Sequence, residues 1–186
     1  MDIPRIFNIS ESAHRIHDPI SPEKLAILGA ALRLKSGARV LDLGSGSGEM
    51  LCTWARDHGV TGIGVDMSPL FTEQAKLRAV ELGVADQVRF IHDDAAGSIS
   101  DFLLLPELVA SFGRLGCDVV EMVLADQDDW DRYEAAKWLT MRRWLEANPG
   151  DEFSKEVRAK LTSEPGRYTA YTREYLGWGI FALMPR

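Results

Sequence analysis

The sequence predicts an α/β protein built on an open, doubly wound and mostly parallel sheet. Three short apolar runs carry no alternating polar face, which is typical of strands covered on both sides by helices. These runs are ARVLDLG (38–44), TGIGVD (61–66) and QVRFIHD (87–93). Segments with helical spacing follow the first two runs, at 48–59 and 68–83. Strands that alternate with helices in this way pair in parallel through right-handed crossovers.

The helix boundaries are marked by capping residues. Ser21 followed by Pro22 predicts the start of a helix over 21–34, before the first strand. Ser68 and Pro69 predict the start of a later helix in the same way, with Gly83 at its end. Gly59 is placed to end the helix over 48–59.

The second half of the chain is mainly helical. We expect a helix with a proline near its middle over 101–116, a strand over 117–125 and a long helix over 128–150. A further helical stretch covers 152–161, and the last strand lies within 175–186. The prediction is therefore a helical insertion at 126–175 between the last two strands.

Composition limits the class of protein. A length of 186 residues suggests a single domain, 1–186. The net charge of -7 argues against a nucleic-acid partner, because such partners are held mainly by Lys and Arg. The start lacks a signal-peptide pattern, and no apolar run is long enough to cross a membrane. Cys52 and Cys117 are expected to be buried thiols, so a cytoplasmic location is expected.

A glycine-rich turn follows the first strand, in VLDLGSGSGE (40–49). Glycines at 44, 46 and 48 permit positive φ and let backbone N–H groups approach a ligand. The third glycine of the dinucleotide fingerprint is replaced by Glu49. Acids at Glu49 and Asp42 suit a ligand with a positive amino or sulfonium group better than one with two phosphates.

Acids also follow the second and third strands. Asp66 lies 22 residues after Gly44, where a carboxylate accepts hydrogen bonds from ribose hydroxyls. The third strand ends in Asp93, Asp94 and Ala95, placed to meet the edge of an adenine ring. A glycine turn alone could be only a tight turn, but three acids in register favour a cofactor site.

With these motifs the chain resembles the class I S-adenosylmethionine-dependent methyltransferases, and within them an uncharacterised bacterial branch similar to small-molecule methyltransferases that act on sterols and quinones. VLDLGSGSG, GIGVDMS and HDDAAG carry the resemblance over 20–97, and it can be followed to the end of the chain. It implies a Rossmann-like fold with an N-terminal lid and helix (1–37), a cofactor-binding half (38–97) and a C-terminal half (98–186).

The resemblance also implies the roles of individual residues. The methionine end of S-adenosylmethionine would lie against Asp42, Gly44, Ser45, Gly46 and Gly48. Asp66 would bind the ribose, Met67 would pack against adenine, and Asp94 and Ala95 would bind the edge of that ring. The product would be S-adenosylhomocysteine, and no metal is implied.

The family sheet has seven strands in the order 3-2-1-4-5-7-6, whereas this chain offers five. Two βα units of about 30 residues each would be expected between Gly97 and Ser98. We hypothesise that the chain lacks this segment, which holds family strands four and five. Its absence would leave the first strand with an unpaired edge and an uncovered apolar face.

The sequence marks the residues that would contact the methyl acceptor less clearly than those that would bind the cofactor. Arg15, Trp130, Tyr133 and Trp178 are candidates for contact with a small apolar or aromatic methyl acceptor, although aromatics at helical spacing are more often packing. His17 is a candidate general base or acceptor-orienting group. The alternative is that His14 and His17 are surface residues on a mobile segment.

Two other functions stay open at this stage. One is a non-catalytic module that binds S-adenosylmethionine, and the other is a nicotinamide-dependent oxidoreductase, which Glu49 and Asp94 disfavour. The expected protein is a monomer or homodimer.

Overall fold

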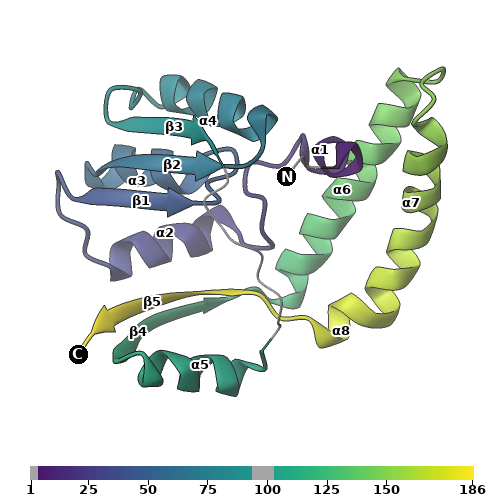
Figure 1. The fold of residues 1–186 in the computed structure, drawn as a ribbon. Coiled ribbons are helices and arrows are strands. Elements are labelled where there is room, and N and C mark those ends of the chain that lie inside the picture. Colours follow the sequence, from purple (N-terminus) through teal and green to yellow (C-terminus); the bar gives the residue numbers. More distant parts are fainter. Residues whose placement is uncertain (1–3, 94–102) are drawn as a thin grey trace.

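The computed structural model describes residues 4–93 and 103–186 as an α/β fold (Figure 1). The elements of the first half are α1 (Arg5–Glu11), α2 (Pro22–Ala31), β1 (Arg39–Leu43), α3 (Glu49–His58), β2 (Thr61–Asp66), α4 (Pro69–Glu81) and β3 (Val88–His92). Those of the second half are α5 (Leu105–Arg114), β4 (Cys117–Leu124), α6 (Gln127–Ala147), α7 (Ser154–Arg167), a π-helix (Tyr168–Thr172), α8 (Arg173–Tyr175) and β5 (Gly179–Pro185).

The described strands form two separate sheets. β1, β2 and β3 make a parallel sheet in that order, as predicted, with Leu41 opposite Ile63 and Gly64 opposite Phe90. β4 and β5 pair antiparallel, with an irregularity between Val119 and Glu121. β5 lies on the side of its sheet that faces β1 (Figure 1). The predicted insertion is present, because α6, α7, the π-helix and α8 all lie between β4 and β5.

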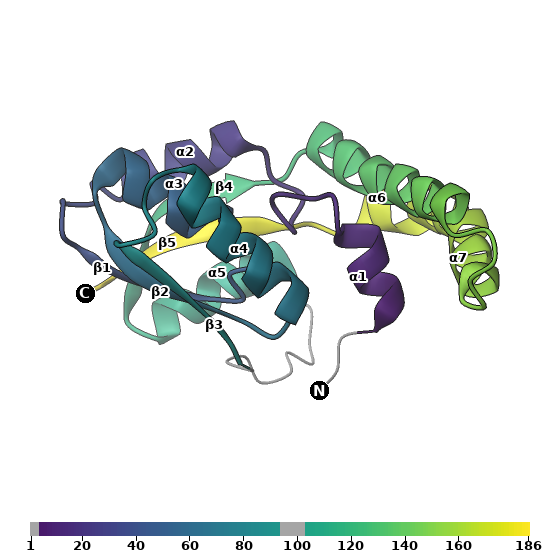
Figure 2. The same cartoon turned by 90° about the horizontal axis from the view of Figure 1, so that it is seen from above.

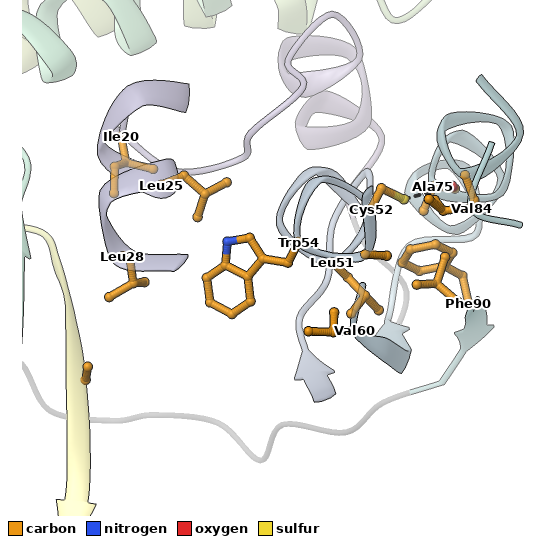
Figure 3. Packing of buried hydrophobic residues seen from close by; sticks show 14 of the residues in the cluster. Ile20, Leu25, Leu28, Leu51, Cys52, Trp54, Val60, Ala75, Val84 and Phe90 are labelled. Atoms are coloured by element: carbon orange, nitrogen blue, oxygen red, sulfur yellow. Dashed lines mark hydrogen bonds between the residues drawn. The ribbon is translucent and has the colours of Figure 1, made fainter. Parts of the chain in front are cut away.

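The main core lies between the parallel sheet and the helices α2, α3 and α4 (Figure 3), and Val123 of β4 and Ala182 of β5 extend it to the second sheet. Leu51 and Val60 are completely buried there. Two glycines of β2 make this packing close: a Cβ on Gly62 would lie 2.8 Å from Leu51 Cδ1, and one on Gly64 would lie 2.5 Å from Phe90 Cδ1. Small residues in β2 therefore let α3 and β3 pack closely against it.

A smaller cluster joins the N-terminal helix to the insertion. Ile9 of α1 packs with Met141 and Leu145 of α6 and Val157 of α7. Seen from above, α1 lies beside the α6–α7 pair, which extends away from the sheets (Figure 2). The N-terminal segment is thus anchored on the insertion before it reaches α2.

Capping residues act as predicted in the first half. Ser21 and Ser68 accept hydrogen bonds from the N–H groups of Lys24 and Phe71, and Gly59 adopts φ +67° after α3. The second half differs from the prediction at the start of α5. Pro106 stands in the first turn of α5 rather than near the middle of the helix, because proline fits where no intrahelical N–H is needed.

The length of α7 and the burial of Cys117 also differ from their predictions. α7 runs on to Arg167, past the predicted end of that helix. Cys117 is only partly buried, because its strand is the outer strand of a two-stranded sheet, whereas Cys52 is buried as predicted. Among residues 4–93 and 103–186, no helix is long and apolar enough to cross a membrane.

Candidate cofactor and acceptor site

The glycine turn joins the carboxyl end of β1 to α3. Gly44, Gly46 and Gly48 have φ of +77°, +52° and +76°, a region that favours glycine. The N–H groups of Gly44 and Ser45 donate to the carbonyl of Val65, at 2.8 and 3.0 Å. The turn is therefore fixed against the end of β2.

Asp66 links this turn to the next helix. Its Oδ2 accepts from the Gly46 N–H at 2.8 Å, and its Oδ1 accepts from the Ser68 N–H at 2.7 Å. The structure thus brings Asp42, the glycine turn and Asp66 together at the carboxyl ends of two neighbouring strands. Met67 follows and is 37% exposed. Asp94, Ala95 and the junction between Gly97 and Ser98 lie outside the described residues.

A group of carboxylates surrounds the turn. Burial, with the negative charges of Asp66 and Asp18, raises the pKa of Asp42 to about 6. Burial raises the pKa of Asp18 as well, with a contribution from the charge of Glu11. His17 acts against this shift at Asp18, whereas every cause of the shift at Asp42 raises its pKa. The site electrostatically favours a cationic ligand group.

Glu49 is paired with a cation of the fold. Its carboxylate accepts two hydrogen bonds from Arg78, from Nε at 2.8 Å and from Nη2 at 3.0 Å. The side chain is nearly buried, and this bidentate pair compensates its charge. Glu49 therefore joins α3 to α4, and it also lines the cavity at the glycine turn together with Asp42 and Asp18.

The N-terminal segment reaches over the turn through His17. The His17 Nε2 lies 2.7 Å from Ser47 Oγ, and the ring stacks on Phe71 with centroids 4.0 Å apart. A Cβ on Gly46 would lie 2.6 Å from His17 Cδ2, so glycine is needed beneath the ring. The side chains of His14 and His17 are only 8% and 11% exposed, so the alternative of surface histidines is wrong.

Glu11 lies behind this histidine. It is completely buried, and its Oε2 is 3.7 Å from His17 Nδ1. The hydroxyl of Tyr133 lies 3.0 Å from Glu11 Oε1 and 2.9 Å from the His17 carbonyl oxygen. Burial alone would raise the pKa of Glu11, but the nearby His17 ring and the charge of Lys137 bring it below its usual value. Glu11 is therefore an ionised carboxylate beside the imidazole.

Two cavities meet at this segment. One of about 90 Å³ lies against the glycine turn and is lined by Asp42, His17, Asp18 and Trp178 among others. The other, of about 320 Å³ and largely apolar, lies between the N-terminal segment and α6. The two share Arg15, Ile16, Asp18 and Ile20.

The candidate acceptor residues are distributed unevenly over these cavities. Arg15 lines both, Trp178 lines the cavity at the turn, and Tyr133 lines the apolar one. Trp130 lines neither cavity. Two other aromatics of the insertion, Trp138 and Tyr168, pack edge to face on each other.

The sequence interpretation did not assign roles to Glu11, Asp18, Ser47 or Gln74. Ser47 donates to Gln74 Oε1 at 2.6 Å, which ties the turn to α4. Of these four residues, Ser47 alone could have been singled out from the sequence, since it stands inside the glycine turn. Glu11 depends on partners more than 100 residues away, such as Tyr133, so no local pattern could reveal it.

This parallel sheet, with a glycine turn after β1 and acids at the ends of β1 and β2, defines an α/β domain that binds a nucleoside cofactor at its strand ends. A model of the methyltransferase domain matches residues 40–131. A methyltransferase from Geobacter sulfurreducens, crystallised with S-adenosylhomocysteine, is 62% identical and covers 100% of this chain and 99% of its own, with a TM-score of 0.93. One from Thiobacillus denitrificans, also with S-adenosylhomocysteine, is 59% identical over 100% of both chains, with a TM-score of 0.92.

The chain belongs to the S-adenosylmethionine-dependent methyltransferases, and its cofactor is S-adenosylmethionine. This finding sets aside the nicotinamide alternative. The protein YjhP of Escherichia coli strain K12 is 54% identical over 248 aligned residues, which cover 100% of both chains. Because this chain has 186 residues, 62 of those aligned positions have no residue of this chain opposite them.

Proposed function

We propose that the enzyme transfers the methyl group of S-adenosylmethionine to a small apolar or aromatic molecule, bound between the N-terminal segment and α6. The observation that carries this proposal is the apolar cavity of about 320 Å³, which shares Arg15, Ile16, Asp18 and Ile20 with the cavity at the glycine turn. An acceptor in the first cavity lies next to a cofactor in the second. Small-molecule sites are typically such largely apolar cavities with a few polar groups.

In this proposal the cofactor binds at the ends of β1, β2 and β3. Asp42 and Asp18 face the positive amino and sulfonium groups, and the glycine turn of Gly44 to Gly48 lies under the methionine end. Asp66 binds the ribose hydroxyls through the oxygen lone pairs that its two backbone hydrogen bonds leave free. Met67 packs on the adenine, whose edge meets Asp94 and Ala95.

His17 is proposed to accept the proton that the acceptor loses, or to orient the acceptor atom. The cofactor supplies an electrophilic methyl group, and alignment with the acceptor provides most of the rate. His17 lines the cavity at the turn, and the ionised Glu11 beside it stabilises the charge that the ring gains with a proton. An acceptor hydroxyl or amine would replace Ser47 as the partner of Nε2.

The proposal is tested by following S-adenosylhomocysteine formation with a panel of small apolar, aromatic and strongly polar acceptors. We expect turnover with the apolar or aromatic members. Ala136 lines the apolar cavity only, so Ala136→Trp should raise the acceptor KM at least about 10-fold and leave the Kd for S-adenosylhomocysteine unchanged. Ala135→Trp, on the neighbouring exposed position of α6, is the matched control.

In the same assay His17→Gln should lower kcat by about 100-fold or more. His14→Gln, which also removes an imidazole next to Glu11, should retain kcat. Equal losses in both variants would assign His17 a structural role. Tight cofactor binding without turnover of any acceptor would favour the non-catalytic alternative.

A further inference from the structure

A chain of hydrogen bonds from α4 determines where the proton on the His17 ring lies. The Gln74 Nε2 donates to the Ser12 carbonyl at 3.1 Å. Because a carbonyl only accepts, the side-chain amide of Gln74 must present its oxygen, Oε1, on its other side. There Oε1 lies 2.6 Å from Ser47 Oγ, so Ser47 donates its one hydroxyl proton to Gln74.

Ser47 can therefore only accept a hydrogen bond from the His17 ring. The His17 Nε2 lies 2.7 Å from Ser47 Oγ, and because the hydroxyl proton is used on Gln74, this contact needs a proton on Nε2. A neutral imidazole carries one N–H, which leaves Nδ1 as an acceptor. With its proton on Nε2, the ring cannot take a second proton from a substrate at that atom.

The other nitrogen of the ring agrees with this tautomer. His17 Nδ1 is 3.7 Å from Glu11 Oε2, and within 4–93 and 103–186 neither of these buried atoms has a hydrogen-bond partner. Two acceptors that face each other leave such a gap, whereas a proton on Nδ1 would bring the two atoms to hydrogen-bond distance. Glu11 is compensated at its other oxygen, Oε1, where the Tyr133 hydroxyl lies at 3.0 Å and Lys137 Nζ at 3.6 Å.

We infer that Gln74 is a positioning residue: through Ser47 it holds His17 in the tautomer with its proton on Nε2, and the ring becomes a base only when the methyl acceptor displaces Ser47. This inference rests on the proposed role of His17. Once Ser47 is displaced, exchange with water moves the ring proton to Nδ1, beside the ionised Glu11, and Nε2 is free to accept. The acceptor atom then bonds to the methyl carbon as the methyl–sulfur bond breaks, and its proton passes to Nε2.

Nitrogen-15 NMR of the histidine rings in the free protein tests this at about pH 8.5, where an ordinary imidazole is neutral. We expect His17 of the parent chain to carry its proton on Nε2. Gln74→Glu keeps an acceptor in front of Ser47 and should keep that tautomer, whereas Gln74→Met lets Ser47 donate to the ring and should move the proton to Nδ1. Both variants lose the hydrogen bond to Ser12, so a merely structural role of Gln74 would give both the same result.

His14 provides an internal reference for these spectra. Its Nε2 lies 3.1 Å from the carbonyl oxygen of Tyr133, so its proton should stay on Nε2 in every variant. Glu73→Met, at the neighbouring exposed position of α4, is the matched control and should leave both rings unchanged.

Two results would show that the inference is wrong: a proton on Nδ1 of His17 in the parent chain, or the same tautomer in Gln74→Glu and Gln74→Met. Because the NMR measurement needs no methyl acceptor, its failure leaves the proposed function standing. Full kcat in His17→Gln would instead overturn the proposed role of His17.

Discussion

Asp18 and Asp42 line one small cavity, and the charge of Asp66 acts on Asp42 from the end of β2. The ionised form of Asp42 is unfavourable in the folded protein, because burial and two like charges raise its pKa to about 6. A buried carboxylate beside like charges lowers the stability of the fold, so stability alone would favour a neutral residue at this position. Its retention is explained by a ligand that brings positive charge, which the amino and sulfonium groups of S-adenosylmethionine do.

Asp42→Asn should therefore stabilise the free protein and weaken cofactor binding. The raised pKa means that the folded state binds a proton that the unfolded chain has lost between about pH 4 and pH 6. The stabilisation due to protonated Asp42 is present at low pH and disappears as the pH rises through about 6. Asparagine, which stays neutral, should raise the free energy of unfolding at pH 7.5 by up to about 3 kcal/mol.

Thermal unfolding of both proteins between about pH 4.5 and pH 7.5 measures this effect. The difference in Tm should grow with pH, while the Kd for S-adenosylhomocysteine should increase at least about 10-fold at pH 7.5. Asp86→Asn, on an exposed residue, is the control. A Tm difference that is independent of pH would show that Asp42 is not the group responsible.

At the level of elements, the sequence predicted what depends on local chemistry. Ser21, Ser68 and Gly59 are caps whose partners lie within a few residues, and the three buried strands follow from uninterrupted apolar runs. Contacts between distant elements could not be predicted in this way. Arg78 pairs with Glu49 across 29 residues, and nothing in either segment indicates that pairing.

The glycine turn gives an element-level prediction with an internal control. Gly48 and Gly37 have almost the same positive φ, +76° and +78°. A Cβ on Gly48 would lie 2.7 Å from Phe90 Cζ and 2.8 Å from Ala75 Cβ, whereas one on Gly37 meets nothing within 4 Å. Gly37→Ala should reduce stability by about 1–2 kcal/mol through backbone strain alone, and Gly48→Ala by about 2 kcal/mol more.

Chemical denaturation measures this pair of variants directly. If the two losses are equal, β3 and α4 do not pack on the turn as closely as the structure shows. A larger loss for Gly48→Ala also predicts weaker cofactor binding, because the turn would shift away from β3.

At the scale of the whole molecule, the described residues form two sheets and one helical insertion, and the proposed cofactor site lies at the ends of β1, β2 and β3. The sequence indicated the α/β class, the parallel order of three strands and the insertion, because each depends on the alternation of elements. It did not indicate how α1 is held on α6, since that contact depends on buried residues such as Glu11 and Met141. The N-terminal segment consequently contributes more to the site than its sequence suggests.

The central claim is that S-adenosylmethionine binds where Asp66 holds the glycine turn. Titration calorimetry with S-adenosylhomocysteine should show saturable 1:1 binding, weakened at least about 10-fold by Asp66→Asn because a charged hydrogen-bond acceptor is lost. Asp86→Asn should bind as the parent chain does. If Asp66→Asn binds S-adenosylhomocysteine with unchanged affinity, the cofactor does not lie at this turn, and the account of the site is wrong.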